Sequence, residues 1–157
     1  MSDLLVRLYE LPPLGPALET LSAAGMVVRR AAAAERSAVV EWARRHGSPG
    51  WADECQAAFA RLPLACFVAV ENDQLIGFAC YEATCRNFFG PELVHPDRSG
   101  RGVGRALLLA ALQAMRAEGY AYAIIGWASS VDFYRRAVGA VVIEGSEPGI
   151  YPAKLLR

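Results

Sequence analysis

The segment PDRSGRGVGRALLLAAL, residues 96–112, combines glycine and arginine in a pattern that suits the binding of an anion. Its closely spaced glycines are Gly100, Gly102 and Gly104, and its arginines are Arg98, Arg101 and Arg105. A glycine costs about 0.5–1 kcal/mol relative to alanine inside a regular element, so three of them indicate that something approaches this backbone closely. Free N–H groups at the start of a helix bind anions, and arginine pairs well with phosphate. The alternative is a tight turn with solvated arginines.

Two familiar phosphate-binding motifs do not fit this segment. A P-loop requires Lys and then Ser or Thr after its last glycine, and Arg105 and Ala106 stand there. The dinucleotide motif GxGxxG would need glycine at position 105 or 107, which hold Arg105 and Leu107. What is left is a G-R-G-V-G loop between a strand and a long helix.

The elements around this loop predict an α+β fold with a mixed sheet. Apolar, β-rich runs at 64–72 and 74–83 flank Asn72-Asp73 and predict a hairpin. The expected order after it is a strand at 87–96, a helix at 103–119, a strand at 120–128, a helix at 129–139 and a strand at 140–145. The two strands that flank the long helix should be parallel, joined by a right-handed crossover.

The N-terminal part of the chain supplies further elements. The expected order is a strand at 4–11, a helix at 14–25, a strand at 26–31, and helices at 34–47 and 48–63. We divide the chain into an N-terminal extension, 1–25, packed on the core, and a domain at 26–157. The extension either covers a sheet edge or contributes to a homodimer.

Two segments resemble the signatures of the GNAT N-acetyltransferase superfamily. ELVHPDRSGRGVGRALL is similar to its acyl-CoA signature, with matches at Val94, Pro96, Gly100, Gly102, Val103 and Gly104. VDFYRRAVGA, residues 131–140, is similar to its second signature, with matches at Phe133, Tyr134 and Gly139. The resemblance covers about residues 26–145. FFGP before the loop and SEPGIY, residues 146–151, are similar to a small bacterial subgroup of the family. Ser99 stands where the family has Arg or Gln, and Trp127 where it often has Asn.

The resemblance implies a sheet that is mostly antiparallel and flanked by helices, and acetyl-CoA as the cosubstrate. The residues expected to bind it are Leu93, Val94, Arg98, Ser99, Gly100, Arg101, Gly102, Val103, Gly104 and Arg105. Backbone amides of 99–104 would hold the pyrophosphate, with Arg98 or Arg101 compensating for Ser99. The N–H of Leu93 or Val94 would polarise the thioester carbonyl.

The same resemblance implies transfer of an acetyl group to a primary amine. Tyr134 matches the tyrosine that protonates the leaving thiolate. Glu92 is the first candidate for the general base, and Glu82 and His95 are alternatives. Trp51, Asp53 and Glu54 occupy the region that covers the acceptor pocket, although an ordinary amphipathic helix explains them equally well. A non-catalytic acyl-CoA-binding module is the alternative function.

Composition and residue spacing argue against several other classes of function. The formal net charge of the chain is zero, which argues against a nucleic-acid partner. The sequence contains no run of 18 apolar residues, so we expect no membrane span. It also has no signal-peptide core, so we expect a cytoplasmic protein. The four cysteines have no CxxC spacing, so we expect reduced thiols and no metal site.

Overall fold

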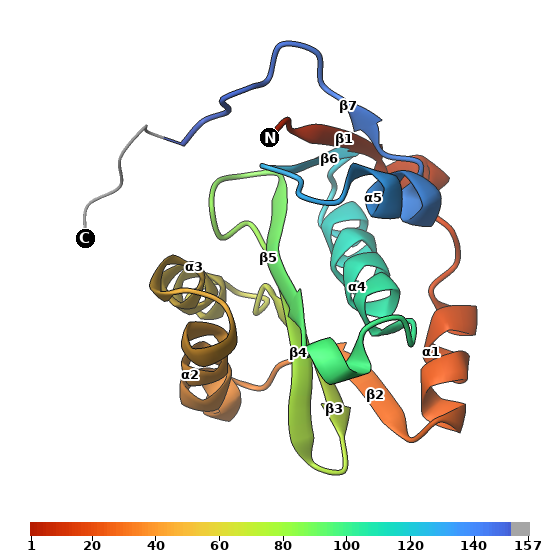
Figure 1. Ribbon diagram of the computed structural model, residues 1–157, viewed down its shortest axis with the longest axis vertical. Coiled ribbons are helices and arrows are strands. Elements are labelled where there is room, and N and C mark those ends of the chain that lie inside the picture. The colour runs from red at the N-terminus through yellow and green to blue at the C-terminus, as the bar shows by residue number, and fades with distance from the viewer. Residues whose placement is uncertain (152–157) are drawn as a thin grey trace.

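The computed structural model describes residues 1–151, and a seven-stranded sheet runs through it (Figure 1). The strand order is β2-β3-β4-β5-β6-β1-β7, and every neighbouring pair is antiparallel except β5 and β6. The predicted α+β fold with a mostly antiparallel sheet is therefore confirmed. The last six residues of the predicted domain, 152–157, lie outside the described residues.

The central hairpin forms where the apolar runs predicted it. Strand β3 spans Cys66–Glu71 and β4 spans Gln74–Tyr81. Asn72 and Asp73 between them have φ values of 49° and 59°. Two adjacent left-handed residues of these types are typical of the two-residue turn whose twist matches that of the flanking strands. On the outer side of β3 lies β2, Met26–Arg30.

The strand–helix–strand unit holds the glycine loop. Strand β5, Phe88–Val94, is followed by the short helix η3, Pro96–Arg98, and then by α4, Val103–Ala117. Strand β6, Tyr122–Ile125, returns parallel to β5, as predicted. Most of α4 is buried against the sheet, and Leu107, Leu112 and Met115 have no exposed surface. This packing fixes the N-terminus of α4 beside β5.

Helices cover both faces of the sheet (Figure 1). On one face lie α1, Gly15–Ala23, and α4; on the other lie α2, Arg36–His46, and α3, Pro49–Phe59. The single turn η2, Ala33–Glu35, precedes α2, and α5, Val131–Val138, follows β6. None of the helices within residues 1–151 has the length and apolar character to cross a membrane.

The N-terminal strand is an interior strand of the sheet. Strand β1, Leu4–Arg7, lies between β6 and β7, Val141–Val142, and is antiparallel to both. Leu4 and Val6 are fully buried in the common core. The boundary at residue 25 stays a prediction, but residues 4–7 belong to the same sheet as the rest of the fold.

Three strands are only about half as long as the apolar runs suggested, or shorter. The run at 4–11 leaves the sheet at Leu8, where the short helix η1, Leu8–Glu10, begins. The run at 120–128 leaves it at Gly126, before Trp127, which has a φ of 48°. The expected strand at 140–145 is limited to β7, because a turn follows in which Ser146 N–H donates to the Ile143 carbonyl. Apolar character continued through these turns, so it did not mark the strand ends.

Candidate active site

The sheet opens between β5 and β6. These strands pair only at Phe88↔Ile124 and Phe89↔Ile125 and then diverge (Figure 1). A cavity of about 790 Å³ lies at the opening. Its wall combines residues 89–92 of β5, the turn at 125–129 after β6, and the first turns of α3 with Tyr134 and Tyr151. The divergence therefore gives a ligand access to one side of the β5 backbone.

The register of β4 and β5 decides which N–H group faces this opening. His95 N–H donates to the Ile76 carbonyl at 2.8 Å, which makes Gly77↔Val94 a pair without mutual hydrogen bonds. Because the two kinds of pair alternate, Leu93 bonds with its partner Phe78 on β4. The N–H of Val94 points away from β4, toward the gap. Of the two predicted donors, the register therefore favours Val94.

Glu92 brings a carboxyl group into the cavity. Its backbone is paired with Ala79 of β4. Oε1 is buried with no hydrogen-bond partner among the described residues, and a Cβ placed on Gly104 would lie 3.6 Å from it. Burial raises the pKa of this carboxyl to about 8, although the hydrogen bond from Tyr134 opposes the shift. Glu92 is thus a group that exchanges a proton near neutral pH.

Tyr134 of α5 meets Glu92 at the same wall. Its hydroxyl donates to Glu92 Oε2 across 3.5 Å, the long end of hydrogen-bond distances. Its ring packs edge-on against Phe89 and Phe133. Burial raises the pKa of this phenol above its usual value, and the nearby Glu92 carboxylate raises it further. Tyr134 is therefore protonated at neutral pH and can donate a proton.

The glycine loop lies at the other side of Glu92, at the start of α4. Gly100 and Gly102 have φ values of 75° and 86°, a left-handed conformation that glycine adopts at little cost. A Cβ built on either would meet nothing within 4 Å, so the backbone faces open space. The first helical hydrogen bond is from Ala106 N–H to the Gly102 carbonyl, which leaves the amides of 103–105 at an uncapped N-terminus. Ser99 differs, because its N–H donates to the Pro96 carbonyl.

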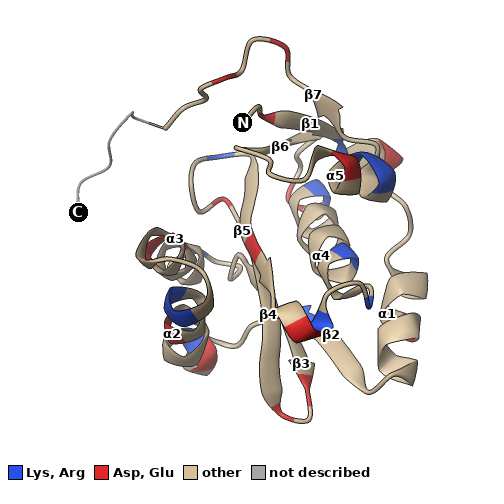
Figure 2. Ribbon diagram, viewed as in Figure 1, with Lys and Arg blue, Asp and Glu red and all other residues tan. Residues whose placement is uncertain are grey.

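The arginines around the loop have a partner that the sequence did not indicate. Arg98 Nε lies 2.5 Å from Glu71 Oε2, and Arg101 Nη1 lies 3.4 Å from Glu71 Oε1. The hydrogen bond from Arg98 holds the pKa of the Glu71 carboxyl below its usual value, and the positive charges of both arginines act in the same direction. Figure 2 shows the basic positions gathered at this loop. Arg105 is exposed, and no ion pair of it is found within residues 1–151.

Comparison with protein families agrees with this arrangement. The model of the acetyltransferase (GNAT) family matches residues 36–140, about two thirds of the chain. The chain belongs to the GNAT family. A comparison with curated proteins gave no match.

Solved structures show the same GNAT fold. A glucosamine N-acetyltransferase region of a fungal multi-domain β-N-acetylglucosaminidase has a TM-score of 0.72 and 16% identity, over 90% of this chain and 19% of that one. A GCN5-related N-acetyltransferase from Sphaerobacter thermophilus has a TM-score of 0.68 and 20% identity, over 90% and 48%. A GNAT acetyltransferase from Brucella melitensis, solved with acetyl-CoA, has a TM-score of 0.51 and 24% identity, over 75% and 86%. This chain thus spans less than half the length of the first two structures.

The two other candidate bases of this GNAT chain lie outside the cavity wall. The Glu82 carboxylate is buried and bonds to Arg61, Tyr120 and the Asn87 N–H, so it holds the β4–β5 connection together. The His95 ring packs against His46, with centroids 5.3 Å apart. Neither side chain lines the cavity, which leaves Glu92 as the candidate base that does.

The region predicted to cover an acceptor does line the cavity. Trp51, Asp53 and Glu54 of α3 form the wall across from β5. Glu54 Oε1 accepts a 2.6 Å hydrogen bond from Thr84 Oγ1, which fixes its carboxylate. Asp53 lies 3.8 Å from Arg44 and is largely exposed. Acidic groups therefore accompany the aromatic surface on this wall.

Asp3 is a residue of this site that sequence reasoning missed. Its Oδ1 accepts the N–H of Trp127 at 2.9 Å, and its carbonyl accepts the N–H of Ile143. The carboxylate thereby holds the turn after β6, which forms part of the cavity wall. Asp3 and Trp127 are 124 residues apart, so no local pattern could have linked them.

Proposed function

We propose that this protein transfers an acetyl group from acetyl-CoA directly to a primary amine. The observation that carries the proposal is the Glu92–Tyr134 pair, in which a buried carboxyl with a raised pKa meets a protonated phenol at the wall of one cavity. A base and an acid in contact with one cavity suit a reaction that removes one proton and supplies another.

Several features of the chain suit acetyl-CoA. The amides of 103–105 and the open backbone at Gly100 and Gly102 form an anion site for the pyrophosphate. Arg98 and Arg101 add positive charge beside it, reduced by their shared partner Glu71. The gap-facing N–H of Val94 is a donor for the thioester carbonyl oxygen.

The chain's groups then have distinct roles. The Glu92 carboxylate accepts a proton as the amine nitrogen attacks the thioester carbon. The Val94 N–H stabilises the negative charge that develops on the carbonyl oxygen. The C–S bond breaks, and Tyr134 donates its proton to the departing thiolate. A free thiol has a pKa of about 8.5, so the thiolate leaves readily and the contribution of Tyr134 is modest.

The acceptor wall suits an amine that carries an apolar body. Trp51, Trp127 and Phe89 supply aromatic surface, and Asp53 and Glu54 attract a cation. A primary amine enters as its ammonium form, releases one proton to solvent to become nucleophilic, and gives a second proton to Glu92 as it attacks. We therefore expect cationic acceptors to react faster than neutral or acidic ones.

The experiment is a thiol-release assay with acetyl-CoA and a panel of amino acids, polyamines, aminoglycosides and peptides. Release that depends on one acceptor, together with its acetylated product by mass spectrometry, supports the proposal. Glu92→Gln serves as the matched control, because it keeps the side-chain shape and removes the base. Binding of CoA without turnover on any amine would instead indicate a non-catalytic acyl-CoA-binding module.

A further inference from the structure

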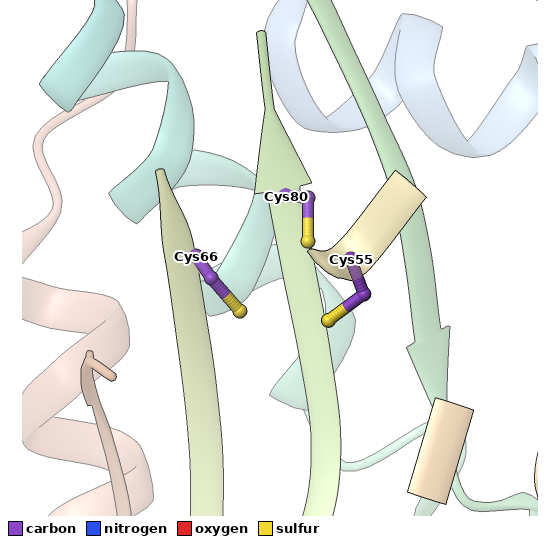
Figure 3. A group of neighbouring side chains, drawn as sticks. All are labelled: Cys55, Cys66 and Cys80. Carbon is purple, nitrogen blue, oxygen red and sulfur yellow. The ribbon is translucent and has the colours of Figure 1, made fainter. Parts of the chain in front are cut away.

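Three cysteine side chains meet in the core, away from the cavity. Cys55 comes from α3, Cys66 from β3 and Cys80 from β4, and each is fully buried. Their sulfur atoms all lie within 4.8 Å of one another. Figure 3 shows the three side chains pointing toward a common centre. The fourth cysteine, Cys85, is not part of this group, which we call the thiol trio.

The backbone fixes the positions of these sulfurs. Cys66 and Cys80 are direct partners across the β3–β4 ladder. The adjacent bond from Tyr81 N–H to the Ala65 carbonyl makes them a pair without mutual hydrogen bonds, the kind whose side chains approach most closely. Helix α3 then places Cys55 over this pair. Three rigid elements thus hold the three donors.

The spacing suits three bonds to one small atom. With a bond to sulfur of about 2.3 Å, as for zinc, the sulfurs lie about 4.0 Å apart in a planar three-coordinate site and roughly 3.3–3.5 Å apart in the pyramidal site of a centre that keeps a lone pair. The trio lies within 4.8 Å, so a contraction of at most about 1.5 Å closes a pyramidal site. Within residues 1–151 no fourth His, Cys, Asp or Glu joins the group, which favours an occupant that is satisfied by three sulfurs.

The net charge of the occupied site decides which of these occupants fits. A monovalent ion on three thiolates leaves two negative charges in the core, and a divalent ion leaves one. Burying a net charge among apolar side chains is costly, and the trio lies in the hydrophobic core. A trivalent centre on three thiolates is neutral.

We propose that Cys55, Cys66 and Cys80 form a three-coordinate site for a trivalent thiophilic metalloid, with arsenite as the probe. Three As–O bonds of As(OH)₃ break and three As–S bonds form. Each thiol proton leaves with a hydroxide as water, so three waters are released, and neither arsenic nor sulfur changes oxidation state. Soft sulfur donors suit such a centre.

Occupation would connect α3 to the central hairpin. Cys55 follows Glu54, which lines the acceptor wall, and the trio would fix that segment of α3 to β3 and β4. The proposal does not rest on acetyl transfer, and its test needs no enzymatic activity. Because the sulfurs have no exposed surface, the probe should enter as the chain folds or when α3 opens.

The test is native mass spectrometry of the full chain, refolded with arsenite and a phosphine reductant that does not compete as a dithiol. The expected product gains one arsenic atom and loses three hydrogens, and X-ray absorption shows three sulfur neighbours and no oxygen. Cys85→Ser is the matched control and should give the same product. Cys55→Ala, checked for folding by circular dichroism, should lose this product.

Two outcomes would overturn the proposal. One is a refolded wild-type protein that carries no arsenic in excess arsenite. The other is an adduct that keeps an As–O bond or needs Cys85, since either shows that the trio does not bind as a unit. X-ray absorption on the wild-type protein decides between three sulfurs and two even if the Cys55 variant fails to fold.

Discussion

Glu92 gives the active-site proposal a measurable pH dependence. Its burial raises the pKa of the carboxyl to about 8, and only the ionised form accepts a proton from the acceptor amine. We expect kcat/KM to rise with pH and to level off above about pH 8. Glu92→Gln should lower activity by roughly 10²–10⁴-fold and remove this limb. A wild-type profile that is flat between pH 6 and 9 would contradict Glu92 as the base.

The same group should affect stability in the opposite direction. The folded-state pKa, about 8, exceeds the usual 4.5, so the native state favours the proton and loses stability as pH rises between these values. Glu92→Gln removes this loss. Urea unfolding should therefore show a stability advantage for Glu92→Gln that is small at pH 4.5 and reaches roughly 2–4 kcal/mol at pH 8. An advantage independent of pH would show that Glu92 is not buried as an ionisable group.

A substitution of Tyr134 tests the general acid of the proposed reaction. Tyr134→Phe keeps the ring that packs on Phe89 and Phe133 and removes only the hydroxyl. We expect kcat to fall by roughly 10²-fold, the low end for general acids because the thiolate leaves readily. Affinity for acetyl-CoA, measured by calorimetry, should change little. Full activity on the acceptor would assign Tyr134 to packing alone.

At the scale of elements, the loop before α4 can be tested with a matched pair of glycines. Gly102 and Gly25 have φ values of 86° and 78°, and a Cβ on either meets nothing within 4 Å. Alanine at each should cost about 1 kcal/mol of stability through backbone strain. Only Gly102→Ala should also weaken CoA binding, by tenfold or more, since its methyl group points into the space for phosphate. Equal CoA affinity in the two variants would remove the loop from the site.

The elements also show what the sequence could and could not predict. The GRGVG spacing and the apolar period of α4 predicted the loop and its helix, because both depend on neighbours along the chain. Glu71 as the partner of Arg98 and Arg101 could not be predicted, because the hairpin brings it there from 27 and 30 residues away in the sequence. The raised pKa of Glu92 depends on its burial in the fold, and the thiol trio depends on three separate elements. These features arise only from packing.

At the scale of the whole molecule, β1 behaves as part of the core. Leu4 is fully buried between β6 and β7, while its neighbour Leu5 is only half-buried. Leu4→Ala should cost about 2–5 kcal/mol of unfolding free energy, and Leu5→Ala clearly less. Urea denaturation of both variants measures the difference. Equal, small losses would indicate that residues 1–25 form a dispensable extension.

The place of β1 has a consequence for the growing chain on the ribosome. Ile125, the partner of Leu4, is synthesised about 120 residues after it, and Val142 is synthesised later still. The apolar side chains of the strand LLVR therefore lack their sheet partners until β6 and β7 have been synthesised. Pairing over such a distance is slow and leaves strand edges exposed to other chains. Assembly of this protein should accordingly finish only after β6 and β7 have emerged, with its first strand among the last to be placed.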